Sequence, residues 1–132
     1  MASENKSSYT LEELETLKTS FEYDEIISNL KDENCHDFIK IFSIINLEKL
    51  NSKEDAKIFI NHLTNHPTPI REACAIKLEE VYKTDLFDDD FSKEKILNAI
   101  SDINPNVCRV ICNILNKYKL DIQKEIIEKI NL

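Results

Sequence analysis

One spacing of apolar residues recurs four times along the chain: two neighbouring apolar positions, and a third apolar position three residues further on. The copies read IISNL, FINHL, ILNAI and IIEKI, at residues 26–30, 59–63, 96–100 and 126–130. Their starts lie 33, 37 and 30 residues apart. Positions spaced in this way share one face of a helix. The pattern therefore predicts four helices of similar design.

A second stretch with helical spacing follows each of the first three copies, after a short polar break. Its apolar positions, which we expect to face the core, are Cys35, Phe38, Ile39, Phe42 and Ile45 in the first unit, Ile70, Ala73, Cys74, Leu78 and Val81 in the second, and Val107, Val110, Ile111, Ile114, Leu115 and Tyr118 in the third. The repeating unit is thus a helical hairpin. Its period falls within the range of roughly 30–47 residues that is typical of helical solenoids.

The two ends of the chain differ from the repeats. We expect residues 1–8 to be a disordered tail and residues 9–132 to form a single domain. A capping box between Thr10 and Glu13 predicts an N-terminal capping helix from Thr10. The fourth copy, which Asp121 can cap, has no second helix. It is either a C-terminal capping helix or part of a longer array.

The breaks between helices carry start signals of their own. Thr68 and Asn104 each precede a proline, so we expect each to cap a helix whose first residue is that proline. Ser92, with Phe91 before it, is expected to cap the helix that contains Ile96. The longest loop is then Thr84 to Phe91, and it contains a run of aspartates.

The second and third units resemble HEAT repeats. The resemblance is strongest at residues 66–78, HPTPIREACAIKL, and weaker at residues 102–109, DINPNVCR. It covers roughly residues 22–132, but the motif is specific only near residues 63–81. The resemblance implies an all-α fold: a right-handed α-solenoid of about three HEAT-like helical hairpins with N-terminal and C-terminal capping helices. The same stripes also fit a seven-helix globular bundle.

In HEAT proteins the second helices line a concave surface that binds partners. By that resemblance, the residues expected on this surface or its edge are Arg71, Lys77, Arg109, Asn113, Asn116 and Lys117. Residues 105–119 carry three basic residues and no acidic one, which suits an acidic peptide or helix. Arg71 also has a structural interpretation, because the equivalent arginine of the family pairs with an aspartate of a neighbouring repeat. Here that aspartate is Asp102.

The composition strengthens the all-helical prediction. The chain has no glycine, although phosphate-binding loops, dinucleotide fingerprints and nucleophile elbows depend on it. The formal net charge is −8, which disfavours binding to nucleic acid and to anionic membranes. No apolar segment reads as a signal peptide or a membrane span, and four cysteines without an export signal indicate reduced thiols. We therefore expect a cytoplasmic protein.

No group of residues predicts a metal, a cofactor or a catalytic centre. Cys108 and Cys112 share a helix face and two histidines stand in the preceding unit, but the spacing of a zinc site is missing. The aspartates of residues 85–90 lack the alternation and the glycine of a calcium loop. Cys35 and His36 are adjacent, so on a helix their side chains diverge. We expect ordinary packing and solvated surface for all of them.

The sequence therefore favours a non-enzymatic scaffold that binds a protein partner through the exposed side of its second helices. One alternative is a HEAT-type enzyme or enzyme subunit, similar to DNA-base glycosylases or to bilin lyases. Another is a regulatory or dimerising part of a larger protein. The oligomeric state stays open.

Overall fold

The computed structural model describes residues 21–118. Every regular element in that range is helical, which confirms the all-α prediction there. The elements in chain order are α2 (Tyr23–Lys31), α3 (Asp37–Asn46), α4 (Lys53–Ile60), the 3₁₀ turn η1 (Asn61–Leu63), α5 (Thr68–Val81), the 3₁₀ turn η2 (Thr84–Leu86), α6 (Asp90–Ala99) and α7 (Pro105–Tyr118). The expected tail at residues 1–8 and the expected helices that begin at Thr10 and Asp121 lie outside the described residues.

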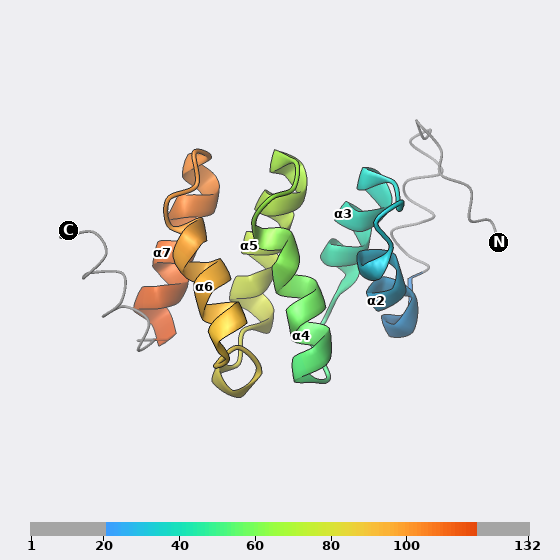
Figure 1. The fold of residues 1–132 in the computed structure, drawn as a ribbon, viewed down its shortest axis with the longest axis horizontal. Coiled ribbons are helices and arrows are strands. Elements are labelled where there is room, and N and C mark those ends of the chain that lie inside the picture. The colour runs from blue at the N-terminus through green and yellow to red at the C-terminus, as the bar shows by residue number, and fades with distance from the viewer. Residues whose placement is uncertain (1–20, 119–132) are drawn as a thin grey trace.

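The helices pair into three hairpins, α2–α3, α4–α5 and α6–α7, which stand side by side (Figure 1). Helix α4 contacts α2 and α6, and helix α5 contacts α3 and α7. The described chain therefore has two layers. We name α2, α4 and α6 the first-helix layer, and α3, α5 and α7 the second-helix layer.

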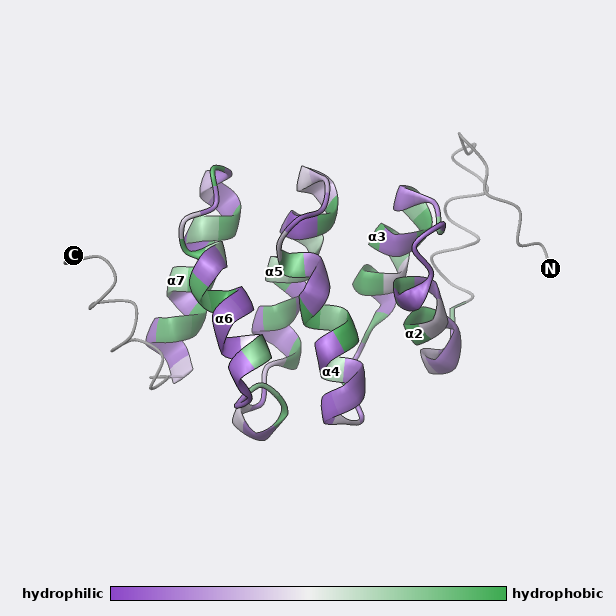
Figure 2. Ribbon diagram, viewed as in Figure 1, coloured by the Kyte–Doolittle hydropathy of each residue, from purple (hydrophilic) through white to green (hydrophobic). Residues whose placement is uncertain are grey.

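The core lies between these layers. Figure 2 shows apolar and polar residues interleaved along every helix, as expected for helices with one buried stripe. The predicted stripes of α2, α5 and α7 are largely confirmed: among their members Leu30, Cys74, Leu78, Ile111 and Ile114 are at most 3% exposed. Burying such side chains removes apolar surface from water, which stabilises the fold by about 25 cal/mol for each Å² of apolar surface buried.

The prediction for α3 is wrong, because a different side of that helix is buried. Phe38 and Ile45 were expected in the core, but each is 43% exposed. The buried residues of α3 are Lys40, Ser43 and Ile44. Helix α3 reads DFIKIFSIIN, so it is apolar on most of its circumference and its periodicity does not select one side. Polar partners in the neighbouring elements select the side that contains Lys40 and Ser43.

The segment between α5 and α6 is more than the exposed loop that the sequence predicts, because it contains the turn η2 and a buried phenylalanine. Phe87 is 1% exposed and meets the Phe59 ring edge-on, with the ring centroids 6.5 Å apart. Tyr82 stacks on Phe87 at 5.3 Å and reaches Tyr118 of α7 at 4.8 Å. Four aromatic rings thus connect α4, the α5–α6 segment and α7 at one end of the layers.

Two of the three predicted helix starts are displaced. Asn104 caps α7 as expected, since its Oδ1 accepts from the N–H groups of Asn106 and Val107. Helix α5 begins one residue early, at Thr68, with Pro67 in the capping position and no side-chain cap bond. Helix α6 begins at Asp90, and its cap is Asp89, not Ser92. The carboxylate of Asp89 lies next to the positive end of the helix dipole, where a negative charge is stabilised.

We predict that replacing Asp89 by alanine lowers the free energy of unfolding by about 1–2 kcal/mol. Asp89 Oδ1 accepts from the N–H of Ser92 at 2.8 Å, and Asp89 Oδ2 accepts from the Ser92 hydroxyl at 3.2 Å. Ser92 is fully buried, so both donors lose their partner. Urea unfolding followed by circular dichroism measures the loss. Asp90→Ala is the control, because it removes an equal charge one residue later, and an equal loss in both variants would contradict this cap.

Candidate functional site

Four of the six predicted partner-binding residues lie on one side of α7. Arg109, Asn113, Asn116 and Lys117 are all exposed, and their spacing places them opposite the buried stripe of the helix. We name the outward side of α3, α5 and α7 the second-helix face. The α7 part of this face is basic and rich in amides.

The two cations of α7 have no acidic partner among residues 21–118. Arg109 Nη2 donates to Asn106 Oδ1 at 3.0 Å, and Lys117 Nζ lies 5.3 Å from the centre of the Tyr118 ring. The ion pairs of the described range involve other residues. Both charges are therefore accessible to a negative group of a partner.

The other two predicted residues, Lys77 and Arg71, form ion pairs within the molecule. Lys77 Nζ pairs with Glu80 Oε1 at 3.0 Å, and the Lys77 side chain is only 12% exposed. Arg71 turns toward the loop between α6 and α7, where it meets Asp102. The hydrogen bonds and ion pairs of Arg71 and Lys77 go to Asp102, the His66 carbonyl and Glu80, and none of them goes to the α7 group.

The second-helix face also contains exposed apolar residues on α3 and α5, which the apolar spacing of the sequence does not predict. Phe38 and Ile45 on α3 are each 43% exposed, and Ile76 on α5 is 48% exposed. Phe38 and Ile45 are seven residues apart, which is two helical turns, so they share one side of α3. Periodicity predicts that Phe38 and Ile45 face the core, and Ile76 falls outside the predicted stripe of α5.

The contact between Arg71 and Asp102 ties the second hairpin to the third. Arg71 Nε donates to Asp102 Oδ2 at 2.9 Å, and Arg71 Nη2 donates to Asp102 Oδ1 at 3.0 Å. Arg71 Nη1 also donates to the carbonyl of His66 at 2.7 Å. The two side chains are 15% and 7% exposed. The structural interpretation of Arg71 is thus confirmed, with a forked and mostly buried geometry.

This pair controls the ionisation of Asp102. Burial by itself would raise the pKa of Asp102, but the hydrogen bonds from Arg71 and from the N–H of Asn104 outweigh it and lower the pKa. The carboxylate is therefore charged at neutral pH, and the loop that contains it is anchored through two hydrogen-bonded neighbours.

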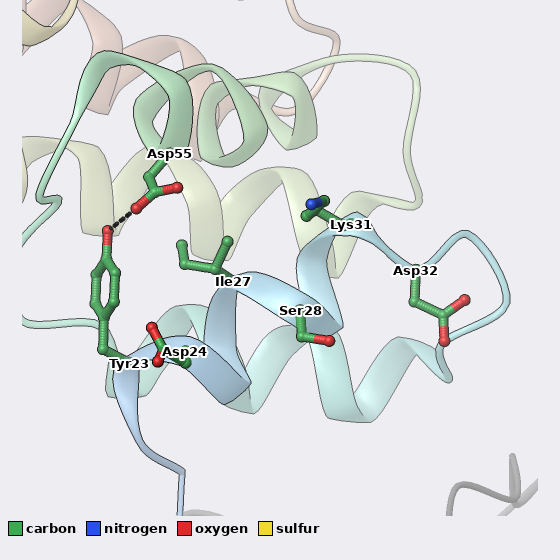
Figure 3. A pocket seen from close by; sticks show the side chains of 7 residues that line it. All are labelled: Tyr23, Asp24, Ile27, Ser28, Lys31, Asp32 and Asp55. Atoms are coloured by element: carbon green, nitrogen blue, oxygen red, sulfur yellow. Dashed lines mark hydrogen bonds between the residues drawn. The ribbon is translucent and has the colours of Figure 1, made fainter.

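Between α2 and α4 a polar cavity of about 460 Å³ opens on the first-helix layer (Figure 3). At one end the Tyr23 hydroxyl donates to Asp55 and accepts from the N–H of Asn51 at 3.0 Å. Burial and the bond to Asp55 raise the pKa of Tyr23 to about 12. Asp32 lies at the far end of the cavity in Figure 3, away from Asp55. Tyr23 thus stays protonated and links two hairpins, and these carboxylates do not converge on one point.

A buried lysine and a buried histidine meet between the first and second hairpins. Lys40 is 6% exposed and His62 is 2% exposed. Lys40 Nζ lies 3.2 Å from His62 Nε2 and donates to the carbonyl of Leu30 at 3.4 Å. His62 Nδ1 lies 3.0 Å from the carbonyl of Ile58. A carbonyl only accepts and an ammonium only donates, so His62 is neutral, with its proton on Nδ1.

The surroundings of His62 keep it neutral over a wide range of pH. Burial, the nearby Lys40 charge and His66 lower the pKa of His62 to about 4. The His66 ring stacks on the His62 ring with centroids 4.5 Å apart. Protonating His62 would remove the acceptor for Lys40 and place two buried positive charges side by side.

The thiols do not form an activated nucleophile. Burial raises the pKa of Cys35 to about 11, and it also raises the pKa values of Cys74 and Cys112. Cys108 Sγ donates to the carbonyl of Ile100. Within residues 21–118 no three histidine, cysteine or acidic side chains gather as a metal site would need. No helix in the same range is long and apolar enough to span a bilayer.

Comparison of this chain with protein-family models, with curated proteins and with solved structures finds no match. The HEAT resemblance therefore stays a prediction that rests on the residues of the second and third units.

We predict that the protein loses stability between pH 6.5 and pH 4, and that His62 causes the loss. The folded-state pKa of His62, about 4, lies below its ordinary value of 6.5. In this window the unfolded chain binds a proton that the folded chain does not, so the free energy of unfolding falls as the pH falls, by about 3 kcal/mol in all. Urea unfolding at several pH values measures the slope.

Two variants separate His62 from other titrating groups. Gln can accept the Lys40 hydrogen bond without titrating, so His62→Gln should flatten the pH dependence in this window. His36→Asn is the matched control, because asparagine keeps the capping role of His36 at α3 and the slope should persist. A slope that is unchanged in His62→Gln would exclude His62 as its origin.

We predict that Arg71→Met lowers the free energy of unfolding by about 2 kcal/mol, because Asp102 then loses two charged hydrogen bonds while mostly buried. Lys53→Met is the control: its pair with Asp88 at 2.8 Å is exposed, at 55% and 47%, so its loss should change stability little. The midpoints of denaturant unfolding measure the stability of both variants, provided that the dependence of the free energy of unfolding on denaturant is the same. Equal midpoints for Arg71→Met and the wild type would show that the pair does not stabilise the fold.

Proposed function

We propose that this protein is a non-enzymatic interaction module, a short α-solenoid of HEAT-like hairpins, that binds a protein partner through its second-helix face. The observation that carries the proposal is the composition of that face. Two accessible cations on α7, Arg109 and Lys117, stand in the same helical layer as the exposed apolar residues of α3 and α5. Repeat proteins with stacked helical hairpins use such extended surfaces to hold partners.

The partner is an amphipathic helix or peptide with acidic residues. Its apolar side would cover Phe38, Ile45 and Ile76, and its carboxylates would approach Arg109 and Lys117. The partner helix would have apolar residues at successive turns along one side. Binding of such a helix through its apolar side is a recurring mode of peptide recognition. Exposed charges contribute mainly to association rate and selectivity, whereas the desolvated apolar anchors contribute most of the affinity.

The test uses a fluorescent helical peptide that has leucines at i, i+3, i+4 and i+7 on one face and glutamates on the opposite face. We expect the wild-type protein to bind it, and the double variant Arg109→Glu with Lys117→Glu to bind it at least about tenfold more weakly. The control is Lys31→Glu with Lys57→Glu, two exposed lysines of the first-helix layer, which changes the net charge by the same amount. Equal weakening in both double variants would show only general charge attraction and would contradict the proposed site.

The apolar half of the surface has its own test. Ile76→Ser removes the most exposed apolar side chain of α5, and since that residue is 48% exposed in the free protein, the fold should keep its stability. We expect weaker binding of the same peptide with unchanged salt dependence, because no charge is altered. Undiminished binding would remove α5 from the proposed surface.

A further inference from the structure

A second cavity of about 460 Å³ lies among the loops within the second and third hairpins. Figure 1 shows these loops at the same end of the two helical layers. The cavity lies between the loop after η1, which contributes Thr64 and Asn65, and the loop after α6, which contributes Ser101 and Ile103. The pair of Arg71 and Asp102 also lines it. Apart from Arg71, its lining residues lie on α6 and in the loops that precede α5 and α7.

The loops that frame this cavity are held in place by polar contacts. Arg71 bonds to the His66 carbonyl on one side and to Asp102 on the other. Asp102 Oδ1 accepts from the N–H of Asn104 at 2.8 Å. Asn65 adopts a positive φ of 61°, in the left-handed region that asparagine tolerates better than most residues. The cavity is therefore preorganised before any ligand arrives.

Lys95 gives the cavity an uncompensated positive charge. Arg71 is neutralised by Asp102, but Lys95 Nζ has a neutral hydrogen-bond partner, Thr64 Oγ1, at 3.1 Å. Its other contact is the ring of Phe91, 5.4 Å from Nζ to the ring centre. No carboxylate of residues 21–118 pairs with Lys95. The exposed polar groups of Asn98 and Ser101 add hydrogen-bond donors beside it.

Ile103 is the apolar residue that lines the cavity. It is 93% exposed, more than any other large apolar residue of the described range. A free inorganic anion would leave this side chain in water. A peptide that carries a carboxylate beside an aliphatic residue satisfies Lys95 and covers Ile103 together.

We propose that this cavity is a second docking site, which takes an acidic side chain of a partner protein segment with an aliphatic residue next to it. Lys95 pairs with the carboxylate, the hydroxyl of Thr64 lies beside it, and Ile103 packs on the neighbouring aliphatic side chain. The site does not depend on the second-helix face, and each can exist without the other.

Nuclear magnetic resonance titration of the full chain tests the site, with a blocked tripeptide of isoleucine, glutamate and leucine as the probe. We expect the peptide to bind with a dissociation constant in the millimolar range. Its binding should shift the backbone amide signals of Asn65, Asn98, Ser101 and Ile103. Replacing the glutamate of the peptide by glutamine should weaken binding about tenfold, because the charged hydrogen bond is lost. Absence of shifts at these four amides would overturn the proposal.

Variants of the protein sharpen the result. Lys95→Gln should abolish the shifts, whereas Lys93→Gln, on the same helix, and the Arg109→Glu with Lys117→Glu double variant should keep them. Ile103→Ser should weaken binding without changing the preference for glutamate over glutamine. Shifts that persist in Lys95→Gln, or identical shifts with acetate alone at the same affinity, would exclude a peptide site and overturn the proposal.

Discussion

A helical hairpin of about 30 residues has more apolar surface than it can cover by itself. In the described chain α5 covers apolar surface of both neighbouring hairpins. It is one of the two longest helices, and it contacts α3 on one side and α7 on the other. Its residues Cys74, Ala75 and Leu78 are fully buried. Stability in stacked hairpins comes largely from the interfaces between neighbours. Without α5, the parts of α3 and α7 that pack against it would face water.

The two interfaces on either side of the central hairpin use different chemistry. The interface with the first hairpin contains a lysine that donates to a neutral histidine and a tyrosine that donates to an aspartate. The interface with the third hairpin contains a forked arginine–aspartate pair and a series of aromatic rings. The first interface therefore depends on a neutral histidine, whereas the second depends on a carboxylate that stays charged to lower pH.

These internal contacts also decide which polar groups are available to a partner. Arg71, Lys77 and Asp102 are engaged inside the molecule. Arg109 and Lys117 of α7 and Lys95 of α6 are among the cations of residues 21–118 that form no ion pair there. The α7 cations share a helical layer with exposed apolar residues, and Lys95 shares a cavity with Ile103. An exposed cation beside an exposed apolar side chain suits an amphipathic acidic ligand better than a small ion, because such a ligand satisfies the charge and covers the apolar surface at once.

The sequence by itself determined the local features. Helical periodicity and the absence of glycine predicted the hairpins, and the buried sides of α2, α5 and α7 followed from their apolar spacing. The motif at residues 66–78 led to the pair of Arg71 and Asp102. These features depend on residues close together in sequence, or on a spacing that the repeat supplies.

Only the tertiary structure decided which side of α3 is buried, where Phe87 lies, and which aspartate caps α6. Helix α3 is apolar nearly all round, so the partners of Lys40 and Ser43 in other elements select its buried side. Phe87 stands in a polar run and is buried because Phe59 and Tyr82 surround it. For the same reason the exposed apolar residues of the proposed sites, Ile76 and Ile103, could not be identified in advance: exposure depends on what the rest of the fold leaves uncovered.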